Sequence, residues 1–109
     1  MFESFYLTVH DVKKNKDRYI LVDVREPDEL KGPEGYIEEA ILATLGAALS
    51  QFLQGADSKA QYVFICRSGK RSGQACEIAR LLGLKAYNMT GGMLAWQEME
   101  AAVPPTSLR

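Results

Sequence analysis

Short apolar runs with the character of buried strands alternate with helical stretches along almost the whole chain. The clearest runs cover residues 19–24, 61–66 and 85–89, and weaker ones cover residues 5–7 and 37–42. The first of these is continuous rather than alternating, which is typical of a strand buried on both faces. Strands separated by helices predict crossover connections, and therefore a mostly parallel sheet with helices on both faces.

The helical stretches between these runs have recognisable ends. Thr8 is suited to cap a helix that ends near Asn15, and further helices are expected over residues 26–30, 45–53 and 93–100. In the helix predicted to begin at Ser72 and end near Leu82, the spacing of apolar residues indicates one buried face. That face is predicted to carry Ala75, Ile78, Ala79 and Leu82.

The chain is long enough for one domain, whose core we place at about residues 5–104 of 109. The tail that begins Val103-Pro104-Pro105 cannot continue a helix. The formal net charge is -1, so neither nucleic acid nor a membrane surface is expected as a partner. Any anionic ligand must therefore be recognised by a local site.

The chain starts without the basic segment and apolar core of a signal peptide, and its apolar runs are far shorter than a membrane span of about 18 residues. The two cysteines, Cys66 and Cys76, are too few for a secreted disulfide scaffold. We therefore expect a location in the reducing cytoplasm. No cofactor is indicated.

Cys66 stands where a predicted strand ends and a helix is about to begin. The unpaired N–H groups and the dipole of a helix N-terminus favour negative charge there. Gly69 permits a backbone conformation in which loop amides converge on an anion, and Arg67, Lys70 and Arg71 add positive charge. Such surroundings favour the thiolate, which is the nucleophilic form of cysteine. The alternative reading is a buried cysteine beside a solvated basic loop.

Three other interpretations of this loop fail on spacing. A phosphate-binding Walker loop needs glycine where the chain has Phe64, and Ser or Thr where it has Arg71. The cysteine phosphatase signature needs arginine six residues after the cysteine, where Ser72 stands. Cys66, Cys76 and His10 do not have the spacing of zinc ligands, so no metal is expected.

Four segments in the same order resemble the rhodanese family. Residues 66–72 are similar to its active-site loop, and residues 23–29 to its D-V-R-x-x-x-E segment. Residues 35–40 resemble G-H-I-x-G-A, and residues 88–96 resemble N-L-x-G-G-x-x-A-W. The match departs from the family at Tyr36, where His is usual, at Glu39, where Gly is usual, and at residues 41–43.

The resemblance implies a five-stranded parallel sheet with helices on both faces and a two-step sulfur transfer. Cys66 would take the outer sulfur of thiosulfate or another small anionic donor as a persulfide, and cyanide, a thiol or a protein cysteine would accept it. The loop from Cys66 to Arg71 has the six-residue length that this family uses for sulfur transfer. Phosphatase and arsenate reductase relatives use seven residues.

Cys66 is therefore the predicted catalytic residue, and the rest of the loop is predicted to bind the donor. These binding residues are Arg67, Ser68, Gly69, Lys70, Arg71 and Ser72. Arg67 and Arg71 would position the anion, although they could instead be solvated charges. Ser72 could equally be the N-cap of the following helix.

Several other polar or aromatic residues are interpreted as structural. Asp23, Arg25 and Glu29 suggest an Arg25–Glu29 pair that holds the loop after the strand at 19–24, because a preformed thiolate needs no general base. Trp96 is expected in the core and Cys76 as a buried thiol. His10 is expected at the surface of the first helix.

The sequence leaves several functions open. A sulfurtransferase is the leading hypothesis, and a module that relays sulfur between a protein donor and a protein acceptor would use Cys66 identically. A phosphatase or arsenate reductase is disfavoured by the loop length. A purely structural member of the family is disfavoured because such members typically lack the loop cysteine.

Overall fold

Five parallel strands form one sheet in the order β1-β5-β4-β2-β3. The computed structural model describes residues 5–102, so the predicted break at Val103-Pro104-Pro105 lies outside the described residues. The all-parallel, five-stranded sheet confirms the predicted fold class. Its strands are β1 (Tyr6–Leu7), β2 (Ile20–Asp23), β3 (Ile41–Leu42), β4 (Gln61–Ile65) and β5 (Lys85–Met89).

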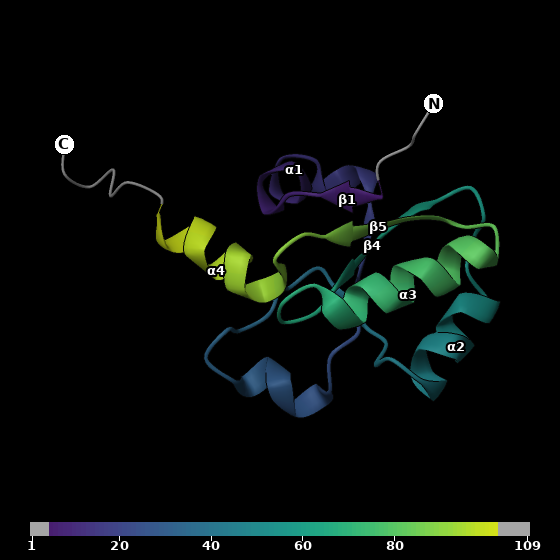
Figure 1. Cartoon of the computed structure of the whole chain (residues 1–109), viewed down its shortest axis with the longest axis horizontal. Coiled ribbons are helices and arrows are strands. Elements are labelled where there is room, and N and C mark those ends of the chain that lie inside the picture. The colour runs from purple at the N-terminus through teal and green to yellow at the C-terminus, as the bar shows by residue number, and fades with distance from the viewer. Residues whose placement is uncertain (1–4, 103–109) are drawn as a thin grey trace.

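Helices cover both faces of this sheet (Figure 1). One face packs against α2 (Ala47–Gln54) and α3 (Lys70–Leu81), and the other against α1 (Val9–Lys14) and α4 (Gly92–Ala101). Two short 3-10 helices lie in the connections, η1 (Lys16–Arg18) and η2 (Pro27–Lys31). Among the described residues, no helix combines the length and the apolar character needed to cross a bilayer.

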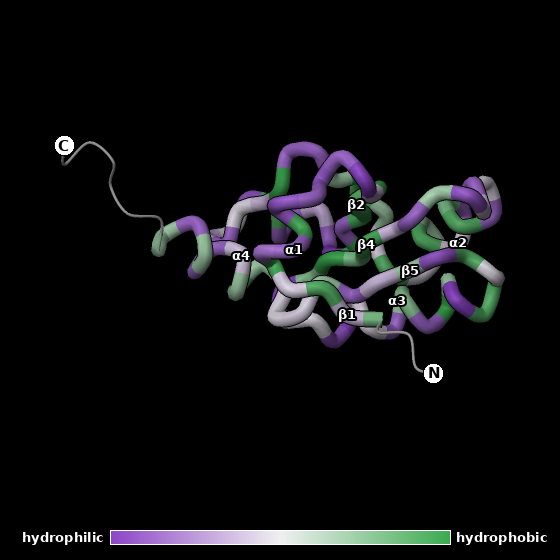
Figure 2. The backbone as a smooth tube through the Cα atoms, turned by 90° about the horizontal axis from the view of Figure 1, so that it is seen from above, coloured by the Kyte–Doolittle hydropathy of each residue, from purple (hydrophilic) through white to green (hydrophobic). Residues whose placement is uncertain are grey.

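The central strand β4 is buried on both sides. Tyr62 and Phe64 belong to the core cluster that includes residues of α2 and α3, whereas Val63 and Ile65 belong to the cluster under α1 and α4. This alternation follows from the opposite directions of successive side chains in a strand. Figure 2 shows hydrophobic residues concentrated in the central strands, with hydrophilic residues in the surrounding loops.

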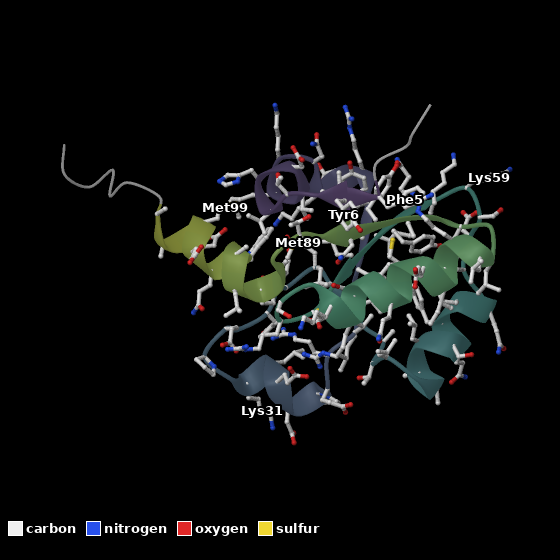
Figure 3. The ribbon with its side chains drawn as sticks, in the orientation of Figure 1. Phe5, Tyr6, Lys31, Lys59, Met89 and Met99 are labelled. Atoms are coloured by element: carbon white, nitrogen blue, oxygen red, sulfur yellow. The ribbon has the colours of Figure 1, made fainter. Side chains whose placement is uncertain are left out.

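Trp96 lies in the core, as predicted, and His10 is exposed on α1. The Trp96 side chain packs in the cluster that also contains Met89 of β5 and Met99 of α4, which are labelled in Figure 3. Complete burial of a side chain of this size contributes roughly 1.5–3 kcal/mol. The last helix is therefore anchored to the sheet immediately beyond the end of β5.

The strand predicted at residues 37–42 is shorter in the structure. Only Ile41 and Leu42 pair with β2. Glu38 and Glu39 instead form a turn, which the Ala40 N–H closes by donating to the Ile37 carbonyl at 3.0 Å. Local turn formation thus removes the first residues of the apolar run from the sheet.

The buried face of α3 also differs from the prediction. Ala75 and Ala79 are buried, but Ile78 and Leu82 are 42% and 60% exposed. The face that packs on the sheet consists of Ser72, Ala75, Cys76 and Ala79. The helix is turned in this way because the Ser72 hydroxyl bonds to side chains of β5 and of the segment after β4, and positions three, four and seven residues later share its face.

Candidate active site

Cys66 directly follows β4, at the edge of the sheet where the carboxyl ends of the parallel strands meet. Gly69 has a φ of 107°, in the left-handed region, and is the N-cap of α3. Because this turn is so tight, α3 begins at Lys70, two residues earlier than predicted. Lys70 and Arg71 therefore lie in the first helical turn and not in a loop before it.

A backbone N–H group and a hydroxyl group both contact the sulfur of Cys66. The Gly69 N–H donates to Sγ at 3.0 Å, and the Ser72 hydroxyl lies 3.2 Å from Sγ. Since Gly69 occupies the N-cap, Ser72 is not the cap of α3, and its hydroxyl faces the cysteine. Cys66 itself is 0% exposed, so Sγ is not open to solvent in this structure.

The environment of Cys66 acts on its charge in two opposite ways. Burial raises the pKa of the thiol, but hydrogen bonds from the Ser72 hydroxyl and from backbone N–H groups outweigh that effect. These N–H groups belong to Ser72, Gly69 and Ser68. The pKa of Cys66 is therefore lower than that of an ordinary thiol, as the sequence predicts for a cysteine at a helix N-terminus.

The start of α4 supports the loop from behind. The N–H groups of Met93 and Leu94 donate to the carbonyls of Cys66 and Arg67 at 2.8 and 3.1 Å. Gly92 has a φ of 58°, and a Cβ atom there would lie 2.4 Å from the Cys66 carbonyl oxygen. Sequence reasoning missed this role of Gly92, although the residue lies in the segment that carries the family resemblance.

Asn88 of β5 is a second site residue that the sequence did not identify. Its Nδ2 donates to the Gly69 carbonyl at 3.0 Å, and its Oδ1 accepts from the Ser72 hydroxyl at 2.6 Å. Asn88 therefore connects the loop to the neighbouring strand. The sequence signals for it were its place at a predicted strand end and its match to the Asn of the N-L-x-G-G-x-x-A-W segment.

Both loop arginines are held by carboxylates. Arg71 donates to the two oxygens of Glu29 at 2.7 and 2.9 Å, and Arg67 donates to Glu34 at 3.3 Å. The paired hydrogen bonds from Arg71 lower the pKa of Glu29 from 4.5 to about 2. Glu29 is thus ionised at neutral pH and neutralises much of the charge of Arg71. Lys70 is exposed on the first turn of α3.

The predicted Arg25–Glu29 pair is wrong. Arg25 turns back to the carboxylate of Asp23, with its Nε and one terminal nitrogen 3.0 and 2.8 Å from the two oxygens. The same terminal nitrogen donates to the Gly35 carbonyl at 2.9 Å. Asp23 and Arg25 are both buried at the end of β2, and they form an ion pair there. Glu29 instead pairs with Arg71 of α3.

Comparisons with known proteins agree with this geometry. The family model described as a rhodanese-like domain matches residues 8–99. The chain belongs to the rhodanese-like domain family. A crystal structure of a rhodanese-related protein from Thermoplasma volcanium is similar to this domain with a TM-score of 0.77 and 30% identity, over 94% of this chain and 96% of that one.

Two relatives of this rhodanese-like domain carry names that point to sulfur transfer. The Bacillus subtilis protein "Putative sulfurtransferase YtwF" is 40% identical over 77 residues, which are 71% of this chain and 72% of the relative. The Schizosaccharomyces pombe protein "Putative thiosulfate sulfurtransferase, mitochondrial" is 37% identical over 96 residues. That match covers 72% of this chain and 63% of the relative.

The departures from the usual rhodanese sequence lie in the segment around β3. Tyr36 is 57% exposed, Glu39 is in the turn before β3, and Ile41 and Leu42 form that short edge strand.

Within residues 5–102 no group of three or more His, Cys, Asp and Glu side chains could hold a metal ion.

The two cysteines of this rhodanese-like domain are expected to react with iodoacetamide at different pH values. Cys76 is buried, and that burial raises its pKa, whereas the pKa of Cys66 is lowered. As pH rises, alkylation of Cys66 should therefore begin first, with a midpoint below that of an ordinary thiol. Peptide mass mapping after short pulses at each pH measures both midpoints. A midpoint for Cys66 at or above that of Cys76 would contradict the described environment.

Proposed function

We propose that this domain is a sulfurtransferase that carries sulfane sulfur as a persulfide on Cys66, with thiosulfate as a donor. The observation that carries the proposal is the position of Sγ at the start of α3, where the Gly69 N–H donates to it at 3.0 Å and the Ser72 hydroxyl lies 3.2 Å away. They favour a thiolate without a neighbouring general base. The six-residue loop, one residue shorter than in phosphatase relatives, favours sulfur over a phosphoryl group.

In the first step, the Cys66 thiolate attacks the outer sulfur of thiosulfate. An S–S bond forms to Sγ, the S–S bond of thiosulfate breaks, and its electron pair leaves with sulfite. The negative charge then resides on the outer sulfur of the Cys66 persulfide. In the second step a nucleophile such as cyanide attacks that outer sulfur, forms thiocyanate and returns the Cys66 thiolate.

The residues around Cys66 fit these steps. Backbone N–H groups at a helix N-terminus stabilise an anion of either sulfur species. Arg67 and Arg71, one and five residues after the cysteine, are the proposed contacts for the sulfonate end of thiosulfate, together with Lys70. The proposed site thus consists of Cys66, residues 67–69 of the loop and residues 70–72 at the start of α3.

A protein-to-protein sulfur relay is the second candidate, and the carboxylates beside the arginines favour it. Glu29 accepts from two of the donors of Arg71, and Glu34 from one donor of Arg67, so each carboxylate competes with a small anion for its arginine. Such competition weakens the binding of thiosulfate. A protein acceptor or donor would instead supply its own contacts around the loop.

Glu29→Gln should strengthen thiosulfate use. The amide keeps the size of the side chain but removes the charge that competes for Arg71, so we expect KM for thiosulfate to fall about three- to tenfold with little change in kcat. Glu38→Gln is the matched control, because Glu38 is exposed on the turn before β3. An unchanged or higher KM in Glu29→Gln would show that Glu29 does not compete with the donor.

Thiocyanate production from thiosulfate and cyanide tests the proposed activity. The proposal expects turnover that shows ping-pong kinetics, because the sulfur is held on the enzyme between the two steps. Slow turnover combined with rapid transfer of sulfur from a persulfidated protein would favour the relay. Absence of both reactions in the folded protein would overturn the proposal.

A further inference from the structure

Three buried side chains, those of Cys66, Ser72 and Asn88, contact one another in sequence at the start of α3. The Ser72 Oγ is 3.2 Å from Cys66 Sγ and 2.6 Å from Asn88 Oδ1. Cys66 and Ser72 are completely buried and Asn88 is 7% exposed. Because solvent scarcely reaches these groups, their polar atoms must be satisfied by one another and by the backbone of Gly69.

The Gly69 carbonyl fixes the orientation of the Asn88 amide. That carbonyl oxygen can only accept hydrogen bonds, so the group 3.0 Å away must be the Nδ2 amino group. Oδ1 of Asn88 consequently faces Ser72. Oδ1 also can only accept, and so its short contact with Ser72 requires the hydrogen of the serine hydroxyl.

Ser72 has a single hydroxyl hydrogen for two acceptors. When Cys66 is a thiol, that hydrogen can remain with Asn88 while the serine oxygen accepts from the S–H group. A Cys66 thiolate can only accept, and it competes for the same hydrogen. If the hydroxyl turns toward the sulfur, the oxygens of Ser72 and Asn88 face each other without a hydrogen between them, which is costly in a buried place.

We propose that Asn88 is a positioning residue that opposes thiolate formation by holding the Ser72 hydroxyl hydrogen away from Cys66 Sγ. No proton is transferred, because only the O–H bond rotates. Asn88 thus limits how much Ser72 can stabilise the thiolate. The nucleophilicity of a thiolate falls as its pKa falls. With Asn88 present, the Cys66 thiolate is therefore more reactive than it would be if Ser72 were free to donate its hydrogen fully to Sγ.

Charged groups also lie around the loop, and any effect they have on Cys66 is separable from the proposed one. Asn88 and Ser72 are uncharged, and the start of α4 contributes only uncharged residues. The effect of Ser72→Ala on the pKa of Cys66 is measured twice, once with Asn88 present and once with Asn88 replaced. The charged groups contribute equally to both measurements, so their contribution cancels in the difference. These groups are the pairs Arg71–Glu29, Arg67–Glu34 and Arg25–Asp23, together with Lys70.

The test is the pH dependence of Cys66 alkylation in four proteins, all carrying Cys76→Ala so that one thiol reacts. They are the parent, Ser72→Ala, Asn88→Ala and the double variant. With Asn88 present, we expect Ser72→Ala to raise the pKa of Cys66 by less than about half a unit. With Asn88 replaced, the same change should raise it by about one unit or more, the size expected for a hydrogen bond to a charged group.

The opposite coupling would overturn the proposal. If Asn88 only anchored the loop or oriented Ser72, replacing Asn88 would leave unchanged, or reduce, the rise in the pKa of Cys66 that Ser72→Ala causes. Far-UV circular dichroism checks that each protein folds, and Asn88→Leu, which has the same branching, repeats the comparison if Asn88→Ala does not. Alkylation requires no sulfur donor, so the result stands independently of the proposed sulfurtransferase activity.

Discussion

Cys66→Ser should abolish the transfer of sulfur from thiosulfate to cyanide, with a loss on the order of 10³-fold or more in turnover. A serine hydroxyl remains protonated at neutral pH and is a far weaker nucleophile toward sulfur than a thiolate. The loop should keep its structure, because serine fits the space of cysteine and can accept from the Gly69 N–H. Steady-state formation of thiocyanate measures the effect.

Cys76→Ser provides the matched control. Cys76 lies one helical turn beyond Ser72, is buried, and has no role in the proposed steps. Its replacement should leave turnover within about twofold, with at most a modest loss of stability from a buried hydroxyl. If Cys66→Ser retained turnover, or if Cys76→Ser lost it, the assignment of the nucleophile would be wrong.

Gly92→Ala should destabilise the fold strongly and disorganise the loop. The alanine Cβ would lie 2.4 to 2.5 Å from backbone atoms of Cys66 and Arg67, and backbone cannot move aside as a flexible side chain can. The backbone at Gly92 also has a positive φ of 58°. Strain in the left-handed region and the overpacking together cost about 2–5 kcal/mol in free energy of unfolding, which urea denaturation measures.

Gly35→Ala separates the two causes. Gly35 has a similar φ of 64°, but a Cβ atom there would meet nothing within 4 Å. Its substitution should therefore cost only the backbone strain, about 1 kcal/mol. Equal losses at both positions would show that the close approach of α4 to the loop contributes nothing.

The central unit of the fold was predictable because its signals are local. The apolar run at residues 62–65, the cysteine after it and Gly69 at the turn all lie close together in the sequence. They suffice to place a cysteine between a buried strand and a helix N-terminus. The parallel arrangement then follows from the alternation of strands and helices.

The predictions that failed or were missed depend on contacts between segments distant in sequence, or on which side chains are buried. Arg25 and Glu29 have complementary charges, but burial at the end of β2 favours Asp23 as the partner of Arg25, and the tertiary fold brings Arg71 to Glu29. The roles of Asn88 and Gly92 depend on where β5 and α4 lie against the loop. Hydrophobic spacing likewise could not show that a serine would set the buried face of α3.

The intact mass of the reduced protein after incubation with thiosulfate, and after removal of the excess, tests the persulfide mechanism most directly. The proposed mechanism predicts a gain of one sulfur atom that cyanide removes and that Cys66→Ser does not acquire. No gain in mass, in a folded protein whose Cys66 still reacts with iodoacetamide, would contradict thiosulfate as the donor.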